Sequence, residues 1–351
     1  MKEIIFVTPN LANGGAERVT AVLASELAER GNRVIVAYMK DRKLVYETGD
    51  LVQTEYLFPR RRGKLYRTAG KIWNLRRLIK KHPQATVVAM LPYETLYTFL
   101  ASFGQRRRII YSLRNDPAQM KGKLERFIGN VIYPTAGTIV FQTREAKAFF
   151  GTRLRNKGVV IPNPVRQDLP KRFDGKRKRE IAAVGRLVPQ KNYPLLLRAF
   201  AGIHMDYPDW KLKIYGEGSL KNDLEHLCRE LSLEKAVEFC GFVPDPADRI
   251  NESGMFVMSS DYEGISNAML EALGSGVPCI CTDCPAGGTR TFIQHKKNGL
   301  LVPVGDCSAL RAAMEKLIKQ PEFAEKLSRE AVKIRQRLSV NAIADEWEKI
   351  L

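Results

Sequence analysis

Asp261–Gly276 reads DYEGISNAMLEALGSG and joins a polar loop to an apolar segment that contains a single charge, Glu271. Burying a carboxylate without a partner costs several kcal/mol, so Glu271 needs a ligand or a local partner. Ser266 or Asn267 is a suitable N-cap, which places Glu263 in the loop and Glu271 about one turn inside a helix. The pattern predicts that both carboxylates approach one ligand and that Glu271 accepts hydrogen bonds from its hydroxyl groups.

The start of this predicted helix is also suited to an anion. Backbone N–H groups from Ile265 to Asn267 are available to cap a phosphate. The alternative is a glutamate favoured by the helix dipole, followed by a core glutamate bonded to backbone. Because apolar residues flank Glu271 and Gly274 and Gly276 follow it, we favour ligand binding.

Strands alternate with helices on the N-terminal side of this stretch and continue beyond it. The first half begins with an apolar strand at Ile4–Thr8, a glycine-containing loop and a helix that ends near Arg30. The second half repeats the alternation from EIAAVG through WKLKIYG, AVEFCG and GMFVMS to VPCICT. This regular alternation indicates an α/β protein with two doubly wound parallel sheets.

The length of 351 residues is sufficient for two domains. Residues 165–179 are polar, basic and contain proline, and are interpreted as the linker. The sequence therefore predicts one domain over 1–164 and a second over 165–337. Ligands of open α/β sheets bind beyond the carboxyl ends of the strands, so the loops that follow strands are the candidate sites.

Two such loops carry unusual residues besides Glu263 and Glu271. Gly14 and Gly15 lie between the first strand and the first helix, where they allow the backbone to approach a ligand closely. Arg186 and Lys191 lie in the loop VGRLVPQKNYP, where two cations beside a helix start suit a diphosphate. A plain tight turn and a pair of solvated cations are the alternatives for these loops.

The net charge of +19 is concentrated in the first half, where residues 1–164 contain 29 Lys and Arg against 12 Asp and Glu. Ten of these cations fall between Phe58 and Leu91 with no acidic residue among them. An apolar stripe recurs there at helical spacing, with Trp73 off the stripe, and consists of Leu65, Ala69, Ile72, Leu75 and Ile79. The stripe predicts an amphipathic helix that contacts an anionic membrane or a lipid pyrophosphate. A solvated outer helix is the alternative. The residues proposed for this contact include Arg60, Arg61, Arg62, Lys64, Arg67 and Lys71.

Composition excludes several other classes of protein. The N-terminal segment KEIIFV is too short for a signal-peptide core, and the longest apolar run contains Pro92 and Glu94, so we expect no membrane span. The six cysteines all lie in the second half, and CICTDC has no nearby histidine. We expect free thiols in a reducing cytosol, and no metal site.

The quoted stretch resembles the E-x7-E signature of retaining glycosyltransferases of family 4, which have the GT-B fold. Glu263, Gly264, Asn267 and Glu271 match that signature. GGAERV resembles the family's N-terminal glycine loop and GRLVPQKN its basic loop. The order and spacing of IYGEG, VEFCGFVPD and ALGSGVPCICTDCPAGG are also similar.

The resemblance implies a role for each matching residue. Glu271 would bind the ribose of a UDP-sugar donor, Arg186 and Lys191 would neutralise its diphosphate, and Glu263 would contact the donor sugar. Gly15 would let the N-terminal loop approach the diphosphate and the acceptor. The family implies two Rossmann-like domains facing a cleft, with a C-terminal helix at about 338–351 returning to the first domain.

One loop departs from the family pattern. Many relatives place a histidine after the fourth N-terminal strand, whereas this chain reads YSLRNDP, so Arg114, Asn115 or Asp116 would take its role. The resemblance implies transfer to a glycan or polyprenyl-pyrophosphate-linked acceptor in bacterial glycan assembly, at the inner face of the cell membrane. We expect this transfer to need no metal, because no suitable loop contains a D-x-D-type acidic pair and Arg186 with Lys191 can stabilise the leaving diphosphate. A sugar-nucleotide epimerase of the same fold and a basic nucleic-acid-binding protein are the alternatives.

Overall fold

The computed structural model describes residues 1–351 except 13, 41–43, 60–62 and 105–107, and it leaves the side chain of Lys64 undescribed. The chain divides into two compact units. Unit 1 contains Met1–Pro164 and Ser339–Leu351, and unit 2 contains Val165–Leu338. Among the described residues, no helix is both long enough and apolar enough to cross a membrane.

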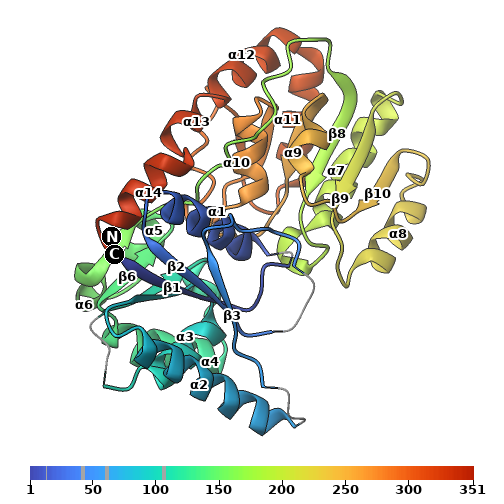
Figure 1. Ribbon diagram of the computed structural model, residues 1–351. Coiled ribbons are helices and arrows are strands. Elements are labelled where there is room, and N and C mark those ends of the chain that lie inside the picture. Colours follow the sequence, from blue (N-terminus) through green and yellow to red (C-terminus); the bar gives the residue numbers. More distant parts are fainter. Residues whose placement is uncertain (13, 41–43, 60–62, 105–107) are drawn as a thin grey trace. The chain divides into compact units, whose positions relative to one another are not determined.

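Unit 1 is built on a parallel sheet with strand order β3-β2-β1-β4-β5-β6-β7 (Figure 1). The strands are β1 (Glu3–Thr8), β2 (Arg33–Tyr38), β3 (Gln53–Tyr56), β4 (Thr86–Ala89), β5 (Ile109–Leu113), β6 (Thr138–Phe141) and β7 (Gly158–Val160). The strand order reverses between β1 and β4. Such a reversal opens a crevice at the carboxyl ends of the strands, which is where ligands bind in this class of sheet.

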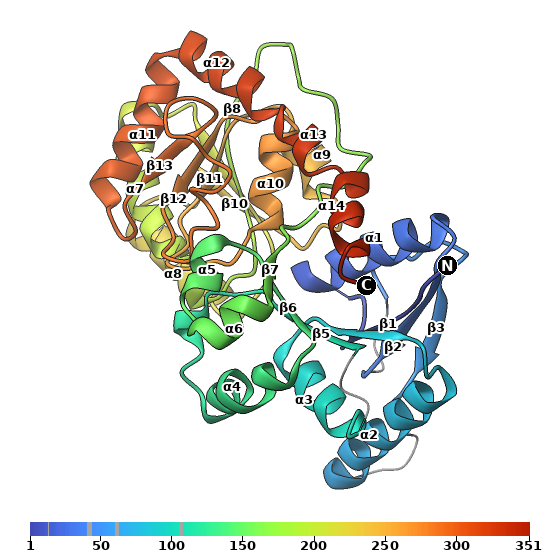
Figure 2. The ribbon, with the colours of Figure 1, turned by 90° about the vertical axis from the view of Figure 1, so that its left-hand side faces the viewer.

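Helices lie on both faces of the unit 1 sheet. They are α1 (Gly15–Glu29), α2 (Lys64–Lys81), α3 (Pro92–Ala101), α4 (Lys123–Phe127), α5 (Arg144–Ala148), α6 (Thr152–Lys157) and α14 (Val340–Glu348). Helices α2 and α3 lie side by side on one face (Figure 2). Leu75, Leu78 and Ile79 of α2 pack on Ile5 and Val7 of β1.

The predicted apolar stripe of α2 is wrong at its N-terminal end. Leu65 is 86% exposed and Ala69 is also exposed, so neither residue packs on the sheet. The buried face instead begins near Ile72, where the helix comes against the sheet. Trp73 was expected off the stripe, and it is 63% exposed.

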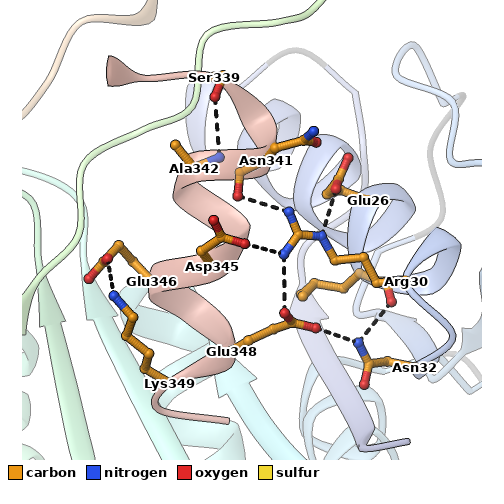
Figure 3. A network of polar contacts seen from close by, with 11 residues as sticks. Glu26, Arg30, Asn32, Ser339, Asn341, Ala342, Asp345, Glu346, Glu348 and Lys349 are labelled. Carbon is orange, nitrogen blue, oxygen red and sulfur yellow. Dashed lines mark hydrogen bonds and ion pairs between the residues drawn. The ribbon is translucent and has the colours of Figure 1, made fainter. Parts of the chain in front are cut away.

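The last helix, α14, packs against α1 within unit 1 (Figure 3). Ser339 caps it by accepting a hydrogen bond from the Ala342 N–H at 3.2 Å. Arg30 joins the two helices, donating to Asp345 Oδ1 at 2.6 Å and to Glu348 Oε2 at 3.1 Å. Trp347 is fully buried, with its ring in edge contact with Phe6 of β1. The C-terminal helix is therefore part of the first unit's core, as the resemblance implied.

Unit 2 is built on a second parallel sheet with strand order β10-β9-β8-β11-β12-β13. Its strands are β8 (Lys178–Val184), β9 (Lys211–Tyr215), β10 (Val237–Gly241), β11 (Ser253–Met258), β12 (Cys279–Thr282) and β13 (Leu300–Val302). Its helices are α7 (Tyr193–Asp206), α8 (Lys221–Glu230), α9 (Pro246–Ile250), α10 (Asn267–Gly274), α11 (Cys307–Lys319), α12 (Pro321–Ala331) and α13 (Ile334–Arg337). The strand order reverses between β8 and β11.

The segment interpreted as a linker is packed on unit 2. Arg166 forms ion pairs with Asp245 and, at 2.6 Å, with Asp248 at the start of α9. Arg177 donates to the backbone carbonyls of Asn251 at 2.8 Å and Gly276 at 2.7 Å. Arg166 and Arg177 therefore bond this segment to unit 2, to which it belongs.

Candidate functional site

The loop after β8 turns sharply into α7. A single 3₁₀ turn, Pro189–Lys191, is followed by Asn192, whose backbone adopts the left-handed region with φ 44°. The Asn192 side chain caps α7 by accepting from the Leu195 N–H at 3.2 Å. Asparagine tolerates this conformation better than most residues, which explains its position directly after Lys191. The turn fixes where Lys191 leaves the backbone.

This loop is bonded to the loop after β11, the neighbouring strand. Asn192 Nδ2 donates to Asp261 Oδ1 at 2.7 Å, and the Asp261 N–H donates to the Gln190 carbonyl at 2.9 Å. Gln190 Nε2 donates to the Tyr262 carbonyl at 2.9 Å. The two loops at the reversal of the strand order are therefore held together before any ligand binds.

Lys191 and Glu263 meet across these two loops. Lys191 Nζ lies 2.5 Å from Glu263 Oε1, and the side chains are only 14% and 10% exposed. Ser260 Oγ donates to the same carboxylate oxygen at 2.9 Å. Low exposure strengthens the attraction within the pair but also makes either charge costly to leave alone. Sequence reasoning identified both charged residues but not their pairing.

Helix α10 begins at the predicted residue. Ser266 is its N-cap and its side chain accepts from the Met269 N–H at 3.4 Å, so Glu263 lies in the loop. Glu271 lies one turn inside the helix and is 4% exposed. Gly288 packs directly on the preceding loop, because a Cβ there would lie 1.5 Å from the Gly264 carbonyl oxygen. These contacts fix Gly264, Ile265 and Asn267 at the helix start.

Arg166 adds a cation near Glu271 that sequence reasoning missed. Burial opposes the charge of Arg166, but its hydrogen bond to Asp248 and the charges of Asp245, Asp168 and Glu271 raise its pKa. Arg166 is therefore a counter-charge for Glu271 that three other carboxylates share.

Arg186, by contrast, is exposed at the carboxyl end of β8, and no ion pair within the described part of the chain includes it.

The cysteines near this site are buried thiols. Cys279, Cys281 and Cys284 lie on or directly after β12, and all six cysteines of the chain are free. Burial raises the pKa of the Cys284 thiol to about 12, so it stays protonated at neutral pH. Across the described ranges, no group of three or more His, Cys, Asp or Glu residues is arranged to hold a metal ion.

The glycine loop of unit 1 is closed by a residue that sequence reasoning missed. Glu17 Oε2 accepts hydrogen bonds from the Gly14 N–H at 2.9 Å and the Ala12 N–H at 3.1 Å. Gly14 is the N-cap of α1, and Gly15 is exposed as its first residue. A glutamate three residues after the N-cap is the usual signal for this closure.

Arg114 lies directly after β5, which is two strands from β1 in the sheet. The preceding strand is the fifth of unit 1 and not the fourth, because β3 was not predicted from the sequence. Its Nη1 donates to Asn163 Oδ1 at 2.7 Å, and its Cζ lies 5.8 Å from the centroid of the Trp347 ring. Burial lowers the pKa of Arg114 to about 9, which still leaves it charged at neutral pH. Asn115 is exposed, whereas Asp116 is buried and accepts from the Ala118 N–H at 2.9 Å.

Glu94 is a second buried charge-bearing group in unit 1. It lies in the first turn of α3, after β4, and is 2% exposed. Burial raises the pKa of Glu94 to about 7, and Glu17 acts in the same direction. Lys40 and Lys71 oppose this shift, but neither forms an ion pair with Glu94 in the described structure.

The predicted basic contact surface is partly described. Arg60, Arg61 and Arg62 lie outside the described residues, as does the side chain of Lys64. Arg67 is exposed on α2, whereas Lys71 is half-buried and burial lowers its pKa. The outward face of α2 carries two aromatic residues, Tyr66 and Trp73, and further cations. These cations are Arg77, Lys80 and Lys81.

Comparison with known proteins agrees with this arrangement of two sheets. Residues 13–169 match the model described as "Glycosyltransferase Family 4", and residues 166–334 match "Glycosyl transferases group 1". The chain belongs to the family 4 glycosyltransferases of the GT-B fold. The resemblance drawn from the quoted stretch is therefore confirmed at the level of family and fold.

Two curated relatives align with the whole chain. An uncharacterized glycosyltransferase of Haemophilus influenzae is 26% identical over 100% of both chains. The GalNAc-alpha-(1->4)-GalNAc-alpha-(1->3)-diNAcBac-PP-undecaprenol alpha-1,4-N-acetyl-D-galactosaminyltransferase of Campylobacter jejuni is 24% identical, covering 100% of this chain and 98% of its own.

Solved structures share the fold at lower identity. Anabaena HepE in complex with UDP and glucose has a TM-score of 0.85 at 19% identity, covering 99% of each chain. TarM of S. aureus, in complex with fondaparinux, alpha-GlcNAc-glycerol and UDP, has a TM-score of 0.82 at 14% identity, covering 100% of this chain and 99% of its own. Both are similar to this glycosyltransferase in fold.

Proposed function

We propose that this glycosyltransferase moves a hexose or N-acetylhexosamine from a UDP-sugar to a glycan or lipid-linked saccharide in bacterial surface polysaccharide or glycoconjugate synthesis. The observation that carries the proposal is the Lys191–Glu263 pair beside the start of α10, with Glu271 buried one turn later. A cation, the N-terminus of a helix and a carboxylate match a diphosphate and its attached hydroxyl groups. The UDP bound to HepE and TarM supports the choice of nucleotide.

In this proposal, donor binding separates Lys191 from Glu263. The diphosphate takes the Lys191 ammonium and the exposed Arg186, with backbone N–H groups from Gly264 to Asn267 nearby, and Glu263 turns to the sugar hydroxyls. Glu271 binds the ribose hydroxyls. The N-terminal loop at Gly14 and Gly15 approaches the diphosphate. No metal is required, because cations of the chain stabilise the leaving charge.

We propose transfer with retention of the anomeric configuration by front-face departure. The bond between the anomeric carbon and the phosphate oxygen breaks, and the acceptor hydroxyl oxygen bonds to that carbon on the same face. The hydroxyl proton passes to the leaving phosphate oxygen, and UDP departs. Glu263 then contacts the sugar without forming a bond to it. A glycosyl adduct trapped on Glu263 would contradict this route.

Unit 1 is the proposed acceptor side, with Arg114, Asn115 and α2 as contacts. The undecaprenol-linked acceptor in the name of the Campylobacter relative supports a lipid-linked acceptor. The outward cations and aromatic residues of α2 suit the interface of an anionic membrane. We therefore propose that the protein binds peripherally to the inner face of the cell membrane.

One experiment tests the proposed donor and reaction together. Thermal shift with a panel of nucleotide sugars should single out UDP-sugars, because a ligand that binds only the folded state raises its melting temperature. The selected UDP-sugar is then incubated with and without acceptor, in EDTA and in manganese. Transfer in EDTA with retained configuration supports the proposal. Conversion of the donor sugar without any acceptor would instead identify an epimerase.

A further inference from the structure

Uncharged groups of unit 1 hold the guanidinium of Arg114. Nη1 donates to Asn163 Oδ1 at 2.7 Å, Nη2 lies 3.5 Å from Met90 Sδ, and the group lies over the Trp347 ring. Gln142 Nε2 also donates to Asn163 Oδ1, at 2.8 Å. Because two donors converge on this oxygen, the amide of Asn163 is fixed with its oxygen toward Arg114.

This cation has no carboxylate partner within the described residues. Neither Asn163 nor Gln142 supplies a charge, and Asp116, the nearest acid along the chain, uses Oδ1 to cap the following turn. Arg114 Nε is buried without a hydrogen-bond acceptor. Removing a guanidinium from water without a counter-charge costs free energy. A protein that keeps such a guanidinium is therefore suited to bind an anionic ligand that supplies the counter-charge.

We propose that Arg114 is the phosphate subsite for the acceptor, with Asn163 and Trp347 as positioning residues. This inference rests on the proposed function, because it assigns the bound phosphate to the acceptor and not to the donor. A guanidinium binds phosphate oxygens with charge-assisted, directional hydrogen bonds. The surplus of cations in residues 1–164 favours an anionic partner for this unit.

The C-terminal helix then has a second role besides stabilising unit 1. The Trp347 ring forms an edge-type contact with the Phe6 ring, and the Arg114 guanidinium lies over the Trp347 ring. A cation over an aromatic face is attracted by the ring's quadrupole, most strongly for tryptophan. Removing the indole would remove this cation–π contact and keep the hydrogen bond from Arg114 to Asn163 Oδ1.

Asn163→Asp in the full-length enzyme tests the subsite. The new carboxylate would lie beside the guanidinium and supply the counter-charge that the ligand otherwise brings. We expect an unchanged or higher melting temperature. We also expect binding of inorganic pyrophosphate to weaken by about tenfold to hundredfold, the usual range for a hydrogen bond to a charged group. Binding is measured by thermal shift with saturating UDP present, which occupies the proposed donor site.

Two core variants separate positioning from packing. Trp347→Leu and Phe6→Leu each remove one partner of the same ring contact, and both should lower the melting temperature. Only Trp347→Leu should weaken the pyrophosphate response and raise the KM for a pyrophosphate-linked acceptor, because the cation–π contact with Arg114 is made by Trp347. Equal responses from both variants would show that Trp347 only packs.

The outcomes distinguish this inference from the proposed function. If UDP stabilises the wild type but pyrophosphate adds nothing, the phosphate subsite is wrong while the donor proposal stands. If Asn163→Asp keeps the full pyrophosphate response, the anion binds elsewhere and the inference falls. If glucuronate raises the melting temperature and pyrophosphate does not, the subsite binds a carboxylate and the proposed phosphate subsite is wrong. If UDP fails to stabilise the wild type, the proposed donor is wrong.

Discussion

Lys191 of unit 2 and Arg114 of unit 1 hold comparable positions, each following a strand of a parallel sheet at its carboxyl end. Lys191 is paired with Glu263, and Ser260 supports the same carboxylate oxygen. Arg114 is bonded to an amide and lies over an indole, and within the described residues it meets no carboxylate. Glu94, a buried acid of unit 1, also forms no ion pair within the described residues.

This difference indicates two ways of preparing a site for an anion. In unit 2 the charges of Lys191 and Glu263 neutralise each other. Under the proposed function, an incoming diphosphate exchanges with Glu263, and the released carboxylate becomes available to hydroxyl groups. In unit 1 Arg114 meets no carboxylate among the described residues, so the anion that we propose for this site would bind without displacing a partner. The first arrangement stabilises the empty protein, and the second costs stability that a ligand restores.

Lys191→Ala and Arg186→Ala should have the largest effect. Each should lower turnover by roughly 10²–10³, the usual loss when one electrostatic stabiliser is removed. Only Lys191→Ala should also lower the melting temperature, because it strands the buried Glu263 while Arg186 is exposed. The double variant Lys191→Ala/Glu263→Gln should recover stability without recovering turnover. Stability unchanged in Lys191→Ala would show that the pair is unimportant to the empty protein.

Glu94→Gln should change stability with pH. Because the pKa of Glu94 rises to about 7 on folding, the folded state binds more protons than the unfolded state, so stability falls as pH rises through that value. Glutamine should remove this penalty and stabilise the protein by up to about 3 kcal/mol at pH 8, with little change at pH 4. Urea unfolding at both pH values measures the free energy of unfolding. Glu55→Gln is the control, because Glu55 is exposed.

Neutralising cations of helix α2 should have the smallest effect per residue, measured as the loss of binding to anionic vesicles. Each cation near an anionic membrane contributes about 1 kcal/mol, so the triple variant Arg67→Gln/Arg77→Gln/Lys80→Gln should release the protein from anionic vesicles. Donor binding should be unchanged. The matched control neutralises three exposed cations of unit 2, Arg229, Lys235 and Lys297. Binding is measured by co-sedimentation with the vesicles. If co-sedimentation falls equally in both variants, binding depends on the net charge of the protein and not on helix α2.

The sequence predicted the parts of the fold that depend on local pattern. Strand and helix alternation gave two parallel sheets, and the cap at Ser266 placed Glu263 in a loop and Glu271 inside a helix. The E-x7-E pattern and the basic loop identified the family, because those residues recur in a fixed order and spacing.

Contacts between distant residues were not predicted. Lys191 and Glu263 are 72 positions apart, and Arg114 and Asn163 are 49 apart, so no local pattern links them. The prediction that Leu65 belongs to the buried stripe of α2 was wrong. Periodicity predicts which face of a helix is apolar, but not how much of the helix length packs on the sheet. The burial of Lys191 with Glu263 depends on how the loops after two neighbouring strands bond together, which no local pattern predicts.

The central claim is that unit 2 binds the donor diphosphate while Arg114 of unit 1 serves the acceptor. Calorimetric titration of UDP into the wild type, Lys191→Ala and Arg114→Gln tests it most directly. We predict that Lys191→Ala binds UDP at least about tenfold more weakly, as expected for a lost charge-assisted contact, while Arg114→Gln binds it like the wild type. Equal weakening by both variants, or weakening by Arg114→Gln alone, would contradict the division of roles.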